Sequence, residues 1–192
     1  MFSSHKGEFG YLKKQPIRIG LFTLLMLLIC AGIFITGYII KGDSKNILTV
    51  AAVLGMLPVA ILIVSFIMYL KAEKCACSKE VKEKFEDLVK GTKVIYGFDF
   101  YMTDYKENFP LFICVSHENC LLCLLADKKY DSKLCKEYLE KYLKNNEING
   151  INISIFDNTD KFISRCKSLD FGSYEISDKD LSSFALVKNL SL

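Results

Sequence analysis

The chain has 192 residues, of which 51% are hydrophobic, and 25 Lys and Arg residues against 22 Asp and Glu residues give it a net charge of +3. The excess positive charge lies in residues 1–70, whereas residues 71–192 are slightly acidic. Because a protein that follows a phosphate backbone needs a basic surface, this distribution argues against nucleic-acid binding by the C-terminal part.

Two apolar runs, Ile19–Ile40 and Ile47–Leu70, contain no charged residue. Each run is long enough to cross a hydrocarbon core of about 30 Å as a helix. The six residues Lys41–Asn46 between them leave room only for a tight turn. The sequence therefore predicts a transmembrane helical hairpin in a lipid bilayer. Neither span carries an Asp, Glu, Lys, Arg or His residue that would mark an ion or proton path.

Basic residues are concentrated on the outer sides of the two spans. Before and at the start of the first span lie Lys6, Lys13, Lys14 and Arg18, and after the second lie Lys71, Lys74, Lys79, Lys82 and Lys84. The turn has only Lys41 and Lys45, partly offset by Asp43. The positive-inside rule therefore predicts a multi-pass cell-membrane protein with both termini in the cytoplasm. Its expected parts are an N-terminal segment (1–16), the hairpin (17–70), a linker (71–77) and a cytoplasmic domain (78–192).

Part of the chain resembles a known family. The stretch Gly7–Tyr11, the pair Lys13-Lys14 and, after the first span, Asn46–Pro58 look like a family of small two-span bacterial membrane proteins of unknown function. Some members of that family carry the label "O-linked GlcNAc transferase-like". The resemblance is clearest over residues 7–75 and brings no catalytic residue to this chain. It implies a membrane location, and the label suggests a transferase as one alternative activity.

Residues 78–192 are long enough for one small domain with its own core. The patterns predict, in order, a helix behind Ser78, strands over 93–102, 111–116 and 120–126, a helix over 134–143, a strand over 151–155, and helices near 162–169 and 181–185. The order α-β-β-β-α-β-α-α predicts a mixed-sheet α/β domain, in which an antiparallel meander precedes a helical crossover to the fourth strand. Ser177 and Asp180 are typical of a capping box.

The sharpest local pattern is Cys114, His117, Cys120 and Cys123, which offers four soft-metal ligands in ten residues. Zinc needs four ligands that converge tetrahedrally. In a strand hairpin Cys120 and Cys123 point to opposite faces, because they are three residues apart. We therefore expect reduced thiols in a core, no metal site and no cofactor, with His117 exposed in the hairpin turn.

The element order also resembles the core of restriction-endonuclease-like nucleases. Those enzymes hold Mg²⁺ with an acidic residue on one strand and Asp/Glu-x-Lys on the next. In this resemblance Asp127 and Lys129 match the second pattern, and Asp99 supplies the other carboxylate. However, residues 127–131 are also typical of a solvated turn before a helix. Strand alternation places Asp99 opposite to its two phenylalanine neighbours, so we expect it to be exposed.

The leading hypothesis is an integral membrane protein without enzymatic activity. Its cytoplasmic domain would bind a membrane protein partner or self-associate as a homo-oligomer, because no catalytic constellation, charged span residue or basic face is present in the sequence. The alternative is a membrane-tethered enzyme, with either a divergent restriction-endonuclease-like domain or the transferase activity that the family label suggests. Loss of a defined reaction on replacing Asp99 or Asp127 would favour the enzyme.

Overall fold

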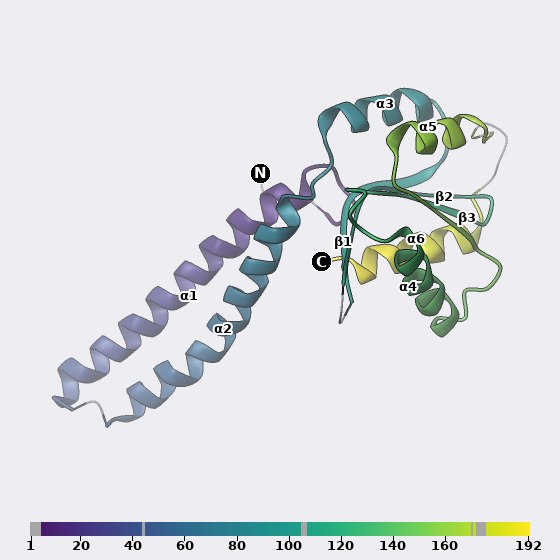
Figure 1. Ribbon diagram of the computed structural model, residues 1–192. Coiled ribbons are helices and arrows are strands. Elements are labelled where there is room, and N and C mark those ends of the chain that lie inside the picture. The colour runs from purple at the N-terminus through teal and green to yellow at the C-terminus, as the bar shows by residue number, and fades with distance from the viewer. Residues whose placement is uncertain (1–4, 44, 105–106, 170, 172–175) are drawn as a thin grey trace. The chain divides into compact units, whose positions relative to one another are not determined.

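The structure is a computed structural model that describes residues 5–43, 45–104, 107–169, 171 and 176–192. Its elements, labelled in Figure 1, are α1 (Tyr11–Lys41), α2 (Ile47–Glu73), α3 (Lys79–Val89), β1 (Ile95–Thr103), β2 (Asn108–His117), β3 (Cys120–Leu125), α4 (Ser132–Asn145), β4 (Asn152–Phe156), α5 (Thr159–Lys167) and α6 (Asp178–Leu190). From α3 onward this is the predicted order of elements. The chain divides into two compact units, one formed by residues 13–73 and the other by residues 74–192 together with the described residues 5–12.

The helical unit consists of α1 and α2, which have 31 and 27 residues. Both helices are long and apolar enough to cross a membrane. They approach closely where a side chain is missing: a Cβ atom on Gly55 would lie 2.8 Å from the Cys30 sulfur, and one on Gly20 would lie 3.0 Å from the Phe66 ring. At Gly32, apart from the neighbouring backbone of α1 itself, no described heavy atom lies within 4 Å of such a Cβ.

The second unit is built on a four-stranded sheet in the order β1-β2-β3-β4. The first three strands are antiparallel neighbours, and β4 pairs parallel to β3 after the crossover through α4. The meander and the crossover are therefore confirmed. A two-residue loop, Glu118 and Asn119, joins β2 to β3, and both residues have a positive φ (51° and 56°), as a tight hairpin turn with the twist of its strands requires.

Strand β2 begins at Asn108, before the start of the strand predicted over 111–116, and therefore includes Pro110. Pro110 lies opposite Tyr101 on β1. The backbone groups of Tyr101 bond instead to the C-terminal residues, so this is a pair without mutual hydrogen bonds. The Pro110 nitrogen points toward the β3 side, at a position beyond the last residue of that strand. The Pro110 carbonyl accepts a hydrogen bond from the Ala126 N–H at 3.0 Å. The proline therefore removes no hydrogen bond from the pairing of β2 with β1.

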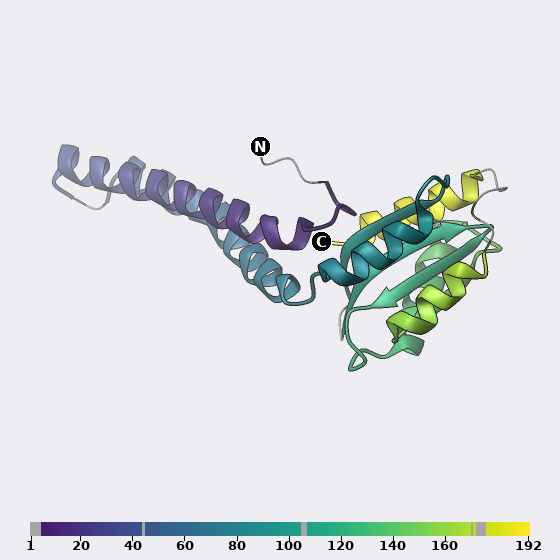
Figure 2. The same ribbon diagram turned by 90° about the horizontal axis from the view of Figure 1, so that it is seen from above.

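Helices cover both faces of the sheet, with α3 and α5 on one face and α4 and α6 on the other (Figures 1 and 2). Each face has its own apolar core. The core under α4 and α6 contains, among others, Phe100, Met102, Leu111, Cys114, Cys123, Cys135 and Leu139. The core under α3 and α5 contains, among others, Phe85, Phe98, Ile113, Val115, Leu122, Phe162 and Phe171.

Strands β1 and β2 change face partway along their length. Phe98 belongs to the core under α3 and α5, whereas Phe100, two residues later, belongs to the other core. Residues two apart normally share a face. The residue between them, Asp99, has a φ of +58°, which turns the strand over. On β2 the register with β3 shifts between Leu111 and Ile113, and these two side chains also enter different cores.

Polar side chains cap the helices of this unit. The predicted capping box of α6 is confirmed, since Ser177 accepts from the Asp180 N–H and Asp180 accepts from the Ser177 N–H. Asp180 is buried and also accepts from the Asn119 N–H at 3.0 Å and the Ser116 hydroxyl at 3.3 Å. Its carboxylate therefore ties the start of α6 to the β2–β3 turn.

Both ends of the chain close the outer edge of β1. The Phe98 N–H donates to the Gly7 carbonyl at 2.8 Å, and the Tyr101 N–H donates to the Ser191 hydroxyl at 2.9 Å. The Leu192 N–H donates to the Tyr101 carbonyl at 3.0 Å. The N-terminal segment, which the sequence separated from the domain, is therefore part of its sheet edge.

Candidate functional site

Asp99 is buried, with 1% of its surface exposed, so the prediction of an exposed position is wrong. One carboxylate oxygen accepts the Gly10 N–H at 2.6 Å, and the other accepts the Cys77 N–H at 2.6 Å. Gly10 immediately precedes α1, and Cys77 follows α2 by four residues. A single carboxylate therefore joins the two chain segments that flank the helical hairpin.

The local sequence makes this arrangement possible. Aspartate is one of the few residues other than glycine that adopt a positive φ at modest cost. Gly97 leaves room for the N-terminal segment, since a Cβ atom there would lie 2.9 Å from the Gly7 carbonyl oxygen. Gly7 itself has a φ of +88°. Phe9 then packs edge-on against Phe98, with ring centroids 6.0 Å apart.

The structure does not bring Asp99 together with Asp127 and Lys129, the residues of the nuclease-like pattern. Asp127 follows β3, while Asp99 lies on β1, and β2 lies between these strands. Two strand spacings correspond to about 10 Å. Asp127 and Lys129 form an ion pair at 3.4 Å in which both side chains are exposed, as in the solvated turn that the sequence also suggested. Exposed pairs of this kind contribute little to stability.

The four candidate metal ligands divide into two pairs. Cys114 and Cys123 lie opposite each other on β2 and β3, with sulfur atoms 3.6 Å apart, in the core under α4 and α6. His117 and Cys120 are also register partners, but the His117 ring packs against Phe171 of the other core, with centroids 4.9 Å apart. His117 is buried, with 1% exposure, so its predicted exposure is wrong. Within the described residues, no three His, Cys, Asp or Glu side chains are placed to share a metal ion.

Three buried thiols of this domain, those of Cys123, Cys135 and Cys166, are held in their protonated form. The hydrogen bond that the Cys123 thiol donates to Cys114, together with burial, raises the pKa of Cys123 well above its usual value. Burial raises the pKa of Cys166 to about 12, and it also raises the pKa of Cys135. Because the thiolate is the nucleophile and the metal ligand, these cysteines act as small apolar core residues at neutral pH.

A second polar contact involves the linker after α2. The Cys75 sulfur lies 3.4 Å from the Tyr130 hydroxyl. Burial raises the pKa of Tyr130 and of the nearby Tyr101, and Cys75 contributes to both shifts. Both phenols therefore stay neutral at physiological pH, and neither can serve as a general base there.

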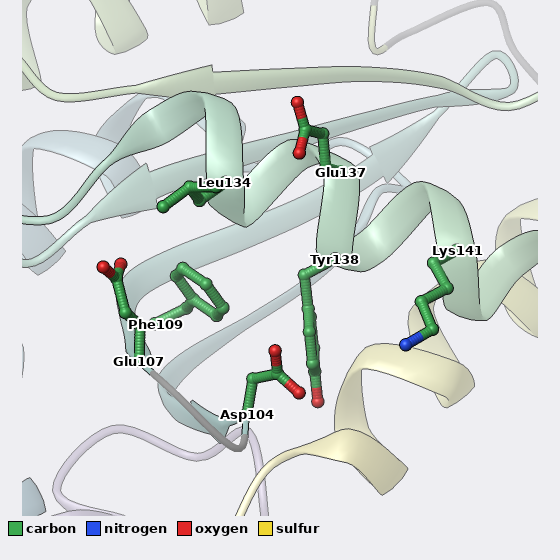
Figure 3. Close-up of a pocket in the computed structure, with 7 residues that line it drawn as sticks. All are labelled: Asp104, Glu107, Phe109, Leu134, Glu137, Tyr138 and Lys141. Atoms are coloured by element: carbon green, nitrogen blue, oxygen red, sulfur yellow. The ribbon is translucent and has the colours of Figure 1, made fainter.

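A pocket of about 240 Å³ lies between α4 and the end of the β1–β2 hairpin (Figure 3). It is lined by Asp104, Glu107, Phe109, Leu134, Glu137, Tyr138 and Lys141. The rings of Phe109 and Tyr138 are buried, with centroids 5.3 Å apart, and they form its apolar floor. Leu134 adds an aliphatic side chain that is 41% exposed.

The described residues that line the pocket have an excess of negative charge. They include three carboxylates, those of Asp104, Glu107 and Glu137, and one ammonium group, that of Lys141. None of the three carboxylates forms an ion pair with a residue that the structure describes. The Tyr138 hydroxyl donates to the Thr103 carbonyl at 3.2 Å. Burial raises the pKa of Tyr138, so its phenol stays uncharged at neutral pH and adds no charge to the pocket.

Sequence reasoning did not find this pocket. Asp104 and Glu107 lie in a segment that the sequence assigned to a polar loop, and Glu137 lies on the exposed face of a predicted helix. Neither context marks a binding residue. The pocket exists because the β1–β2 hairpin and α4, which are separated along the chain by β3, meet in space.

We predict that Asp99→Ala lowers the free energy of unfolding of the domain by about 3 to 5 kcal/mol, because one buried and one part-buried N–H group lose their acceptor and alanine disfavours a positive φ. Asp99→Asn keeps one acceptor oxygen and tolerates this φ, so we expect a loss of about 1 to 3 kcal/mol. Urea unfolding of the full chain in lipid nanodiscs, followed by near-UV circular dichroism, measures both effects. The control is Asp104→Ala, at an exposed carboxylate, which should change stability by less than about 0.5 kcal/mol. Equal losses at positions 99 and 104 would contradict the role of Asp99.

We also predict that N-ethylmaleimide labels only Cys75 and Cys120 of the native chain at pH 7, because these two thiols are half-exposed and the other six are buried. Mass spectrometry of digested protein identifies the labelled positions, and urea-denatured protein provides the control in which all eight react. Rapid labelling of Cys114 or Cys123 in the native chain, or stoichiometric zinc in protein purified without chelators, would contradict the assignment of these thiols to the core.

Comparison of the chain with protein families, with curated proteins and with solved structures gives no match. The resemblance of residues 7–75 to two-span bacterial membrane proteins therefore stays a prediction, and the interpretation of the pocket rests on its geometry and charge.

Proposed function

We propose that this protein is an integral membrane protein whose C-terminal domain is a protein-binding module tethered to the cytoplasmic face of the cell membrane. The partner is either another membrane protein or a second copy of the chain. The observation that carries the proposal is the pocket between α4 and the β1–β2 hairpin, which combines an apolar floor with three carboxylates that have no ion-pair partner among the described residues.

The membrane location is supported by α1 and α2. Outside lipid, their exposed side chains would leave a large apolar surface in water, since Ile17, Leu21, Ile39, Ile47 and Ile61 are each at least 66% exposed. Burial of apolar surface is the main driving force for transfer into the bilayer. The basic residues on the outer sides of both helices support a cytoplasmic position of both termini.

The candidate catalytic residues Asp99, Asp127 and Lys129 are arranged in a way that favours a binding role over catalysis. The Asp99 carboxylate is occupied by backbone N–H groups, and Asp127 and Lys129 form an exposed pair on the far side of β2. The carboxylates of the pocket, by contrast, are exposed around a hollow with aromatic walls. Such a hollow suits recognition of a side chain better than activation of a nucleophile.

We predict that a C-terminal epitope tag after Leu192 is digested by protease in inside-out membrane vesicles and protected in sealed right-side-out vesicles, because the positive flanks stay in the cytoplasm. A periplasmic or extracellular marker protein, digested only in the second preparation, confirms the orientation of the vesicles. Protection in inside-out vesicles and digestion in right-side-out vesicles would reverse the proposed topology.

We further predict that a photo-crosslinking amino acid at position 134, on the rim of the pocket, gives a discrete adduct in native membranes. The same amino acid at position 161, an exposed site on α5, should give none. Glu137→Lys should abolish the adduct at position 134, because it reverses the charge of the rim. Immunoblotting shows the adducts, and their mass distinguishes a second copy from another protein. Equal adducts at both positions, or none at position 134, would argue against a binding module at this pocket.

A further inference from the structure

The size of the pocket limits what it can hold. Pockets for drug-sized ligands have volumes of about 300 to 1,000 Å³. The volume of about 240 Å³ between α4 and the β1–β2 hairpin is below this range and suits one long side chain. Its floor, made by Phe109 and Tyr138, and the exposed Leu134 side chain favour an occupant with an aliphatic stem.

The charge of the pocket selects the end group of the occupant. Among the described residues that line the pocket, Asp104, Glu107 and Glu137 outnumber Lys141, and this excess of negative charge favours a cation over an anion. A bare metal ion fits less well, because it gains nothing from the apolar floor and no described acidic cluster can enclose it.

We propose that this pocket binds a basic side chain, with an aliphatic stem and a terminal positive charge, that a partner polypeptide presents to the domain. The inference rests on the proposed function and adds to it the chemical class of the recognised group. The stem lies against Phe109, Tyr138 and Leu134, and the charge lies among the carboxylates of the rim. An exposed rim in water predicts weak binding by a single side chain, so affinity for a whole partner needs further contacts around the pocket.

The test uses N-acetyl-lysine methylamide as the probe and N-acetyl-norleucine methylamide as its matched control, which has a similar aliphatic stem and no charge. Each is titrated into the isotopically labelled full chain in zwitterionic lipid nanodiscs, and nuclear magnetic resonance follows the Leu134 methyl groups and the Phe109 ring. We expect saturable shifts with the lysine probe in the millimolar range and at least about fivefold weaker binding of the norleucine probe. Raising the salt concentration from 0.05 to 0.5 M should weaken only the lysine probe, because salt screens exposed charges.

Two charge-neutralising variants of α4 locate the interaction. Glu137→Gln should weaken binding of the lysine probe about two- to fivefold. Glu140→Gln removes the same charge from the same helix, but Glu140 is paired with Lys136 and does not line this pocket, so binding should not change. Both residues are exposed, so an unchanged spectrum outside the pocket shows that each variant folds.

Equal binding of the two probes, equal effects of the two variants, or no saturable shift would overturn the proposal. Tighter binding of free 1,5-diaminopentane than of the lysine probe would overturn the assignment to a polypeptide side chain in favour of a small amine. These failures are distinct from failure of the proposed function. If the adduct at position 134 persists while neither probe binds, the domain is a binding module that recognises a different group.

Discussion

The Asp99 carboxylate is the interaction on which the rest of the domain depends. It accepts one N–H from the segment before α1 and one from the segment after α2, both at 2.6 Å, in an interior position. Hydrogen bonds to a buried charge are stronger than those between neutral groups, and an N–H left without its acceptor there is costly. The domain consequently includes residues from both sides of the helical hairpin, so its N-terminal segment is held in the fold although about sixty residues of hairpin follow it along the chain.

The same residue organises the two cores. With a φ of +58°, Asp99 turns β1 over between Phe98 and Phe100, and the irregularity of β2 next to it does the same between Leu111 and Ile113. Each of these two strands can therefore supply large apolar side chains to both helical layers. The sheet gains two dense cores from short strands, and the carboxylate gains an interior position beside the edge that the N-terminal segment covers.

The proposed function and the proposed ligand class concern a different part of the domain from Asp99. They concern the pocket between α4 and the β1–β2 hairpin and its acidic side chains. Asp99 has its charge satisfied by the backbone, whereas Asp104, Glu107 and Glu137 belong to the lining of the pocket and have no ion-pair partner among the described residues. The contrast separates a carboxylate that maintains the structure from carboxylates that are available to another molecule. Rigid support comes from the buried Phe109 and Tyr138 beneath them.

The sequence by itself determined the apolar hairpin helices, the order of elements in the domain and the capping box of Ser177 and Asp180, because hydrophobic runs, periodicity and caps are properties of neighbouring residues. It did not reveal the burial of Asp99 and His117, because alternation assumes a regular strand and a turn is usually exposed. Nor did it reveal the pocket, whose walls are distant in the chain. Only the tertiary structure decided these features, because they depend on contacts between residues that are remote in the chain. These contacts set the positive φ within β1, cover the edge of β1 with the N-terminal segment, and bring the β1–β2 hairpin against α4.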